Sequence, residues 1–370
     1  MSKAADLANL IGNINAGGGG VNRNIIINGA MNVSQRGTSF TTVTDGTYTL
    51  DRFNYRKNND GEVTITQDSS GPDGFANSLK VDVTTADTSI AAAQFAIIEY
   101  NIEAQDLQKL AFGTSSAKNF TLSFYVKSNK TGTYAVNISQ QDNSAKQATL
   151  NYTINSANTW ERKSLTFTGD TSGVINDDNG LGFLLYWWLA VGTTFTLGGS
   201  TSATFQAYDN ADAAAGHAVN LLDDAANEWF ITGVQLEIGQ NATEFEHEPI
   251  ERTLDKCYRY FQQHVSGDQF TGFFDGSTRS TSRVAGNGYK YFKTMRTAPS
   301  LTVSDVGDFS IRDGPNNDKG SPTSVSIGRP GLNFTTLLFD KSSGGLTADK
   351  PHSVVADNTS TAALIFDSEL

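Results

Sequence analysis

Residues 229–261, WFITGVQLEIGQNATEFEHEPIERTLDKCYRYF, combine three periodicities in one stretch. Apolar and polar residues alternate over 234–238, which is the period of a strand with one buried and one solvated face. Acidic residues then occupy every second position of 244–248, until Pro249 ends any ladder. From residue 250 apolar residues recur at helical spacing. The stretch predicts the last strand of one domain, a joint, and a short helix that leads into the first strand of another domain.

The composition of the whole chain agrees with two β domains. A chain of 370 residues is too long for one small core. Its 35 glycines and its low content of charged residues, 18%, favour an all-β protein with many turns. The net charge of -12 argues against a nucleic-acid partner, which would require a basic face. No apolar run has membrane length, so no membrane insertion is expected. The single cysteine, Cys257, is expected to be a buried, unreactive thiol.

Residues 22–249 predict a jelly-roll sandwich. Short segments of strand-like pattern follow one another at the spacing of such folds: 62–67, 78–83, 92–99, 120–127, 133–140, 148–154, 160–168, 182–189, part of 193–207, and 229–238. The three isoleucines at 25–27 predict a first strand buried on both faces, which would lie near residues 231–238. A short helical crossing is expected at 101–110.

Residues 250–370 predict a second, smaller β-sandwich. Its expected strands are 258–261, 288–293, 300–306, 309–312, 323–327, 333–339 and 362–366. Two loops would stand at one end of this sandwich, 275–284 and 313–322. Because loops on a rigid β scaffold commonly carry recognition, their polar side chains are candidates for contact with a receptor. These candidates are Arg279, Arg283, Asn316 and Asn317.

The N-terminal residues 1–21 form a separate piece. Apolar residues at i, i+3, i+4 and i+7 predict one helix with a single apolar stripe, made of Leu7, Leu10, Ile11 and Ile14. Four consecutive glycines at 17–20 then predict a flexible tether. A helix this short is marginal in water, so its stripe requires a partner surface. Two interpretations are open: an anchor that docks into another protein or its own copies, and a helix folded back on the chain's own domain.

Four phrases of the sequence resemble phage tail-fibre and virion-surface proteins. They are NIIINGAM, QRGTS and YTLDRF within 24–53, NTWERKSLTFTGDTSG at 158–173, TGVQLEIG to RYF within 232–261, and FKTMRTAPSLTV at 292–303. The opening is also similar to that of carbohydrate-binding-module jelly rolls. The resemblance implies a virion fibre with a jelly-roll body and a β-sandwich tip, and it implies a homotrimer. It further implies assembly in the host cytoplasm and a final location on the phage particle, on the head or the tail.

Cofactor sites have little support in the sequence. Asp177 and Asp178 lie in an oxygen-rich loop, and a second such loop spans 209–212. Oxygen ligands suit calcium, but neither loop ends in the bidentate glutamate of a calcium loop. Solvated turns are therefore the competing interpretation, and no other cofactor is expected. The four histidines are scattered along the chain, which argues against a metal site.

Features that suggest catalysis or sugar stacking have simpler interpretations. The acidic residues of 244–248 would share one strand face, which is typical of a solvated edge rather than of a glycosidase pair. Trp187 and Trp188 would point to opposite faces of one strand, so at most one could stack on a sugar, and core packing is favoured for both. Tyr55 and Tyr208, in polar segments, are better candidates for a sugar platform.

The sequence thus predicts a non-enzymatic virion protein. Its N-terminus would bind other virion proteins, and the assembled trimer would attach to a host-surface glycan or protein with the avidity of several weak sites. Two alternatives are open. One is a purely structural decoration of the capsid or tail. The other is a polysaccharide depolymerase with acids at subunit boundaries, against which the lack of a long solenoid repeat argues.

Overall fold

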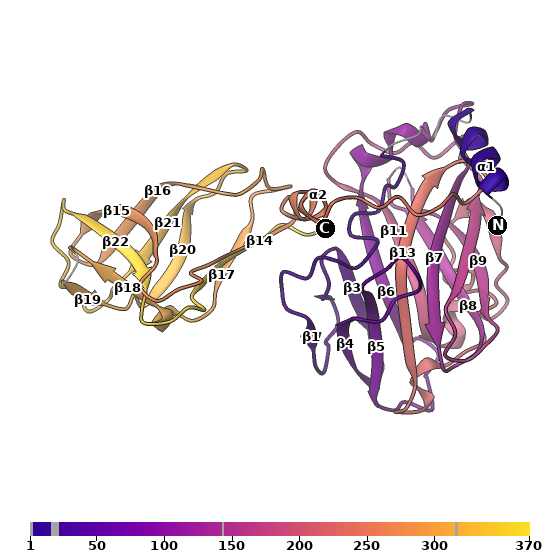
Figure 1. The fold of residues 1–370 in the computed structure, drawn as a ribbon, viewed down its shortest axis with the longest axis horizontal. Helices are drawn as coiled ribbons and strands as arrows, with labels where there is room; N and C mark the ends of the chain where they lie inside the picture. Colours follow the sequence, from indigo (N-terminus) through magenta and orange to yellow (C-terminus); the bar gives the residue numbers. More distant parts are fainter. Residues whose placement is uncertain (1–2, 16–21, 143, 315–316) are drawn as a thin grey trace. The chain divides into compact units, whose positions relative to one another are not determined.

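The computed structural model describes residues 3–15, 22–142, 144–314 and 317–370, without the side chains of Asn13, Asn15 and Arg279. The chain divides into two compact units, unit 1 with residues 1–254 and 370, and unit 2 with residues 255–369. Helix α2 (Ile250–Cys257) contains the division. Figure 1 shows the strands of each unit. All pairings between the strands named below are antiparallel.

Unit 1 is built on two sheets. Sheet A has the order β1-β4-β5-β13-β7-β10, with β1 (Ser39–Phe40), β4 (Glu62–Asp68), β5 (Ser78–Thr85), β7 (Phe120–Ser128), β10 (Glu161–Phe167) and β13 (Glu228–Ile238). Sheet B has the order β12-β9-β8-β11-β6-β3-β2, with β2 (Thr47–Tyr48), β3 (Phe53–Lys57), β6 (Phe95–Glu103), β8 (Gly132–Gln140), β9 (Lys146–Ile154), β11 (Leu181–Val191) and β12 (Ser202–Ala207). Short 3-10 helices connect them: η1 (Ala104–Leu110), η2 (Thr193–Phe195), η3 (Asn210–Asp212) and η4 (Leu221–Asp223).

One hydrophobic core lies between the two sheets. It receives alternate residues of each strand, such as Phe124 of β7 and Trp187 of β11, whose rings meet edge to face at 6.0 Å. The last strand of unit 1, β13, lies in the middle of sheet A and pairs with both β5 and β7. Two antiparallel sheets around one core, with a central strand contributed by the end of the chain segment, form a jelly-roll sandwich. This confirms the predicted fold.

Strand β13 differs from the prediction in one respect. Its polar side chains do not face solvent, because Gln235 and Glu237 are both buried. Segments 22–29 and 241–246 cover this face and exchange hydrogen bonds with it. A bulge at Gly233, with φ of +61°, interrupts the pairing with β7. The alternation of apolar and polar residues therefore predicted the position of the strand correctly. It could not predict that both faces are buried, because the segments that cover the polar face lie elsewhere in the sequence.

The three isoleucines lie beside β13 as expected, but they do not form a regular strand. The Ile25 amide donates to Leu236 O at 2.9 Å, and the Val234 amide donates to Gly29 O at 2.9 Å. A turn begins at Ile27. Residues 244–248 do not form a strand either. The interpretation of an acidic edge is wrong for Glu246, whose carboxylate accepts the amides of Asn22, Arg23 and Asn24 at 2.7 to 2.9 Å.

Unit 2 is a smaller β-sandwich. One sheet has the order β14-β23-β17, with β14 (Phe261–Val265), β17 (Ser300–Val303) and β23 (Ala363–Asp367). The other has the order β19-β18-β22-β15-β16-β21-β20, with β15 (Gly272–Ser280), β16 (Arg283–Lys290), β18 (Phe309–Arg312), β19 (Asp318–Gly320), β20 (Ser324–Arg329), β21 (Phe334–Asp340) and β22 (Pro351–Ala356). The 3-10 helix η5 (Val306–Asp308) precedes β18. Phe309, Phe339 and Phe366 belong to its core.

The prediction of a loop at 275–284 is wrong. These residues form a hairpin of β15 and β16, in which Thr278 lies opposite Val284. Many of their residues are small and polar, Gly, Ser and Thr, so the segment lacks the apolar alternation that identifies a strand. Strand β22 was missed as well. Cys257, at the end of α2, is buried as predicted.

Candidate functional site

A row of polar side chains crosses the outer face of sheet B. Cross-strand partners point to the same face of a sheet, and the register places them side by side on five neighbouring strands. We call this set the polar row: Asn54 of β3, Glu99 of β6, Tyr186 of β11, Asn137 of β8 and Thr149 of β9. On the inner face, one residue further along each strand, side chains such as Tyr55 and Trp187 enter the core.

Glu99 is the electrostatic centre of the polar row. Its carboxylate is buried and accepts from Asn54 Nδ2 at 3.2 Å, while the Arg56 guanidinium lies 3.4 Å away. Burial raises the pKa of Glu99, and the charge of Arg56 opposes this shift. Arg56 Nε also donates to the carboxylate of Asp45 at 2.9 Å, close to solvent. A buried carboxylate thus fixes a partly exposed guanidinium, and within the described residues its Nη2 donates to no other group.

Tyr186 stands beside Glu99, and Tyr208 lies near Tyr186. Tyr186 is half-buried, and its pKa is raised by burial first and then by the Glu99 charge and by Tyr208. Tyr208 keeps 44% of its surface exposed. Amphipathic rings of this kind stack on apolar faces of a ligand and offer a hydroxyl at the edge. The predicted platform role is wrong for Tyr55, which is fully buried on β3, whereas Tyr208 does lie near the polar row.

The segment between β11 and η4 folds back over the rest of this face. Trp188 packs there against Ala213 and Ala214 and is buried, as core packing predicted. Trp187 points the other way, into the main core. The Gln147 side chain of β9 donates to Asp209 O at 2.5 Å, which ties the covering segment to sheet B. Asn54, Glu99, Asn137 and Thr149 of the polar row are buried, and Tyr186 is half-buried. Next to the Glu99 carboxylate, Arg56 is partly exposed and its partner Asp45 is exposed.

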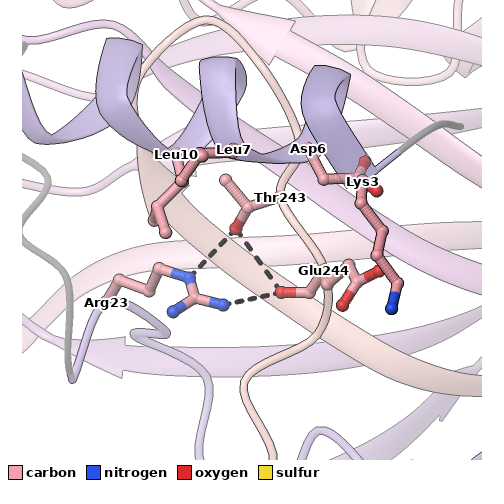
Figure 2. Close-up of a pocket in the computed structure, with 7 residues that line it drawn as sticks. All are labelled: Lys3, Asp6, Leu7, Leu10, Arg23, Thr243 and Glu244. Carbon is pink, nitrogen blue, oxygen red and sulfur yellow. Dashed lines mark hydrogen bonds between the residues drawn. The ribbon is translucent and has the colours of Figure 1, made fainter.

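A separate crevice of about 320 Å³ lies beneath helix α1 (Lys3–Asn15) in unit 1. Figure 2 shows Leu7 and Leu10 projecting from the helix toward Arg23 and Thr243. The helix therefore lies on its own unit, which was one of the two open interpretations. The stripe is nevertheless only partly covered, because Leu7, Ile11 and Ile14 remain 57, 50 and 43% exposed. The predicted tether lies largely outside the described residues.

A buried ionic network forms the floor of this crevice. Arg23 Nε donates to Thr243 Oγ1 at 2.9 Å (Figure 2). It also lies 3.7 Å from the Glu237 carboxylate. Glu237 is only 1% exposed and also accepts from the Thr243 amide and hydroxyl at 2.8 and 2.7 Å. Because every partner is on a different segment, the network holds 22–24 and 241–246 onto β13. Its role is structural.

Two of the predicted receptor residues of unit 2, Arg279 and Arg283, lie near the closed end of one hairpin, in which Ser280 is opposite Arg283. Arg279 lies on β15, and Asn316 falls outside the described residues. Arg283, on β16, makes a bidentate pair with Asp340, with Nη2 to Oδ2 at 2.9 Å. Asn317 closes a turn through its backbone, accepting from the Asp313 amide at 3.2 Å.

Unit 2 also exposes two phenylalanine rings, Phe292 and Phe334, that the sequence did not single out. Phe292 stacks on the buried His264 with ring centres 3.8 Å apart and is 54% exposed. Phe334, opposite Lys290 on the neighbouring strand, is 62% exposed. Burial lowers the pKa of His264 to about 4, so its ring is neutral at neutral pH. The pairing of β16 with β21 sets Phe334 opposite Lys290, two positions before Phe292.

The calcium candidates are exposed turn residues. The Asp178 carboxylate accepts from the Gly180 amide at 2.8 Å, an interaction internal to the turn. Within the described ranges, no group of three His, Cys, Asp or Glu residues could hold a metal ion. In the same part of the chain, no helix has the length and apolarity needed to span a membrane.

The chain resembles known proteins in structure only, and the structural similarity is low. Neither a family model nor a curated protein matches the chain. Among solved structures, the enzymatically active domain of tailspike protein 4 of bacteriophage CBA120 matches with a TM-score of 0.30 and 12% identity over 54% of this chain and 21% of that one. The family 11 carbohydrate-binding module of a Clostridium thermocellum cellulosomal cellulase matches with a TM-score of 0.28 and 13% identity, over 56% of this chain and 98% of the module. At these values the likenesses carry no argument about function, and the fold assignment rests on the sheet order described above.

Proposed function

We propose that the protein is a non-enzymatic glycan-binding protein of a phage particle, and that the polar row is its glycan site. The observation that supports a glycan is the Glu99 end of the row, where the buried Glu99 carboxylate fixes the partly exposed guanidinium of Arg56 beside the half-buried Tyr186. Sugars present hydroxyl groups that need both donors and acceptors, together with apolar ring faces that pack on aromatic rings. The virion location rests on the sequence resemblance alone, as does the homotrimer.

Replacement of Tyr186 with alanine is expected to weaken glycan binding about tenfold or more, because the ring and the hydroxyl beside Glu99 are lost. The probes are neutral oligosaccharides, namely β-1,4-galactotriose and a mixed-linked β-glucan tetrasaccharide, together with purified host-surface polysaccharide. Binding is measured by isothermal titration calorimetry. Tyr125→Ala is the matched control, since Tyr125 is a half-buried tyrosine on sheet A.

The same titrations separate the alternatives. Equal affinities of the Tyr186→Ala and Tyr125→Ala variants would remove the polar row as the site. If host polysaccharide gave new reducing ends on mixing, the protein would be a depolymerase. Binding of none of the probes would favour a decoration protein.

The exposed part of the α1 stripe is the proposed attachment point to other virion proteins. Removal of residues 1–20 is expected to leave the molar mass measured by light scattering at that of a trimer, because we infer that the β units, and not α1, join the copies. The variant Leu7→Gln/Ile11→Gln is expected to behave in the same way, with Ala8→Gln as a control on the same helix. A truncated chain that becomes monomeric would show that α1 joins the copies, and the attachment role would be lost.

A further inference from the structure

A row of alternating aromatic and basic side chains crosses the outer face of sheet A, away from the polar row on sheet B. Phe230 of β13 lies opposite Lys127 of β7 and opposite Lys80 of β5. Trp160, which directly precedes β10, meets the Phe230 ring edge to face at 6.1 Å. We call Trp160, Lys127, Phe230 and Lys80 the aromatic–lysine row.

Lys127 is held between two rings. Its ammonium lies 4.0 Å from the centre of the Phe230 ring and 5.1 Å from that of Trp160. Ring faces attract a cation, so this geometry fixes a long and otherwise mobile side chain. Within the part of the chain that the structure describes, no carboxylate or carbonyl oxygen pairs with this ammonium. Its three N–H donors are therefore left to solvent or to a ligand.

Lys80, the other lysine of the row, differs from Lys127 because it is paired with carboxylates. Lys80 is 2.5 Å from the Glu228 carboxylate and 3.5 Å from that of Asp82, so its charge is neutralised within the sheet. On the other side, Glu161 is occupied by Lys163 at 2.6 Å and by the backbone of Asn155 and Ser156. The acids around the row already have partners, which leaves the Lys127 charge uncompensated in a protein of net charge -12.

Trp160 supplies a surface for stacking. Of the four tryptophans, Trp187, Trp188 and Trp229 are buried, whereas Trp160 is half-exposed. An indole face is large, rigid and apolar, and it packs well on a sugar ring. The Lys127 ammonium lies over this ring, 5.1 Å from its centre, so it can pair with a negative group on a sugar that packs on the exposed part of the indole.

We propose that the aromatic–lysine row is a second glycan site and that it binds a sugar unit bearing a carboxylate, such as a uronic acid. The sugar ring stacks on Trp160, and its carboxylate pairs with the Lys127 ammonium. A nucleic-acid backbone requires several uncompensated cations, and this row offers one beside a neutralised lysine. The inference extends the proposed glycan attachment to an acidic substrate class but uses none of the residues of the polar row.

The test uses trigalacturonate and its fully methyl-esterified form, which differ in charge but not in linkage. Because Trp160 is the exposed tryptophan, binding is followed by intrinsic fluorescence and by protection from acrylamide quenching. We expect trigalacturonate to bind and to protect, and the methyl ester to bind at least about tenfold more weakly. Added sodium chloride should weaken the binding of the free acid only.

Variants identify the site. Lys127→Gln is expected to reduce the affinity for trigalacturonate about tenfold, and Trp160→Ala to abolish the protection as well. Lys118→Gln is the matched control, because it also removes one half-buried lysine, just before the start of β7. This variant is expected to bind trigalacturonate as tightly as the wild type does. Circular dichroism confirms that each variant is folded.

The proposal is overturned if the methyl ester binds as tightly as the acid, if Lys127→Gln retains wild-type affinity, or if trigalacturonate does not bind at millimolar concentration. Tyr186→Ala in the same assay separates the two glycan sites. Unchanged uronate binding in that variant supports an independent site on sheet A, even if the polar row binds no glycan. Loss of uronate binding in that variant would place the acidic sugar on the polar row and refute the inference.

Discussion

Replacement of Arg23 with alanine is expected to lower the free energy of unfolding of unit 1 by about 3 kcal/mol. The Glu237 carboxylate is 1% exposed, so its charge would remain buried without the guanidinium that lies 3.7 Å away. The Arg23 hydrogen bonds to Thr243 Oγ1 and Glu244 O would also be lost. Urea unfolding followed by circular dichroism measures the change.

A second substitution checks the cause of that loss. The double variant Arg23→Ala/Glu237→Gln keeps a hydrogen-bond acceptor at position 237 but removes the buried charge. It is therefore expected to be more stable than Arg23→Ala alone, a non-additive result typical of paired groups. Arg252→Ala is the surface control: its ion pair with Glu248 is 3.8 Å long and its side chain is 56% exposed, so a loss below about 1 kcal/mol is expected. If Arg23→Ala cost no more than Arg252→Ala, the network would not be a structural element.

Replacement of Gly29 with alanine is expected to cost unit 1 about 3 kcal/mol as well, for a steric reason. A Cβ at this position would lie 2.1 Å from Val234 O and 3.1 Å from Val234 C. Those atoms belong to the backbone of β13 and cannot rotate away. The 2.9 Å hydrogen bond from the Val234 amide to Gly29 O would have to lengthen, which would loosen the first segment from the central strand.

Thermal unfolding measures this effect, with Gly12→Ala as the control. A Cβ on Gly12, in α1, meets no atom within 4 Å, and alanine is the better helix former. That variant is expected to keep or slightly raise the melting temperature. A Gly29→Ala protein that melts like the wild type would mean that segment 22–29 does not pack on β13 in the way described.

Periodicity predicted the strands well where each strand has an apolar face. Residues 120–127 alternate cleanly, and β7 buries Phe120, Leu122, Phe124 and Val126 in the core. The same reasoning failed for β15, because small residues such as Gly276 and Ser277 carry no apolar pattern. Periodicity also wrongly predicted a solvent-exposed face for β13. A pattern of alternate residues reports that two faces differ in character, but it does not report what covers the polar one.

The residues of the candidate sites could not be grouped from the sequence. Glu99, Asn54 and Tyr186 are far apart in the chain, and none of them stands in a motif. They share a row because β3, β6 and β11 are neighbours in sheet B in a particular register. In the same way, Trp160 and Phe230 lie 70 positions apart and meet across β7. Sequence spacing predicts contacts within one strand, whereas contacts across strands depend on strand order.

By itself the sequence determined the fold class, two β units, the position of most strands and the burial of Cys257, because these follow from local composition and periodicity. The tertiary structure decided which faces are covered, where the ionic network forms and which polar side chains meet on the outer faces. The physical reason is that strand order in a jelly roll is non-local. The last strand of unit 1 lies in the middle of its sheet, so segments separated by about two hundred residues, such as Gly29 and Val234, become hydrogen-bonded neighbours.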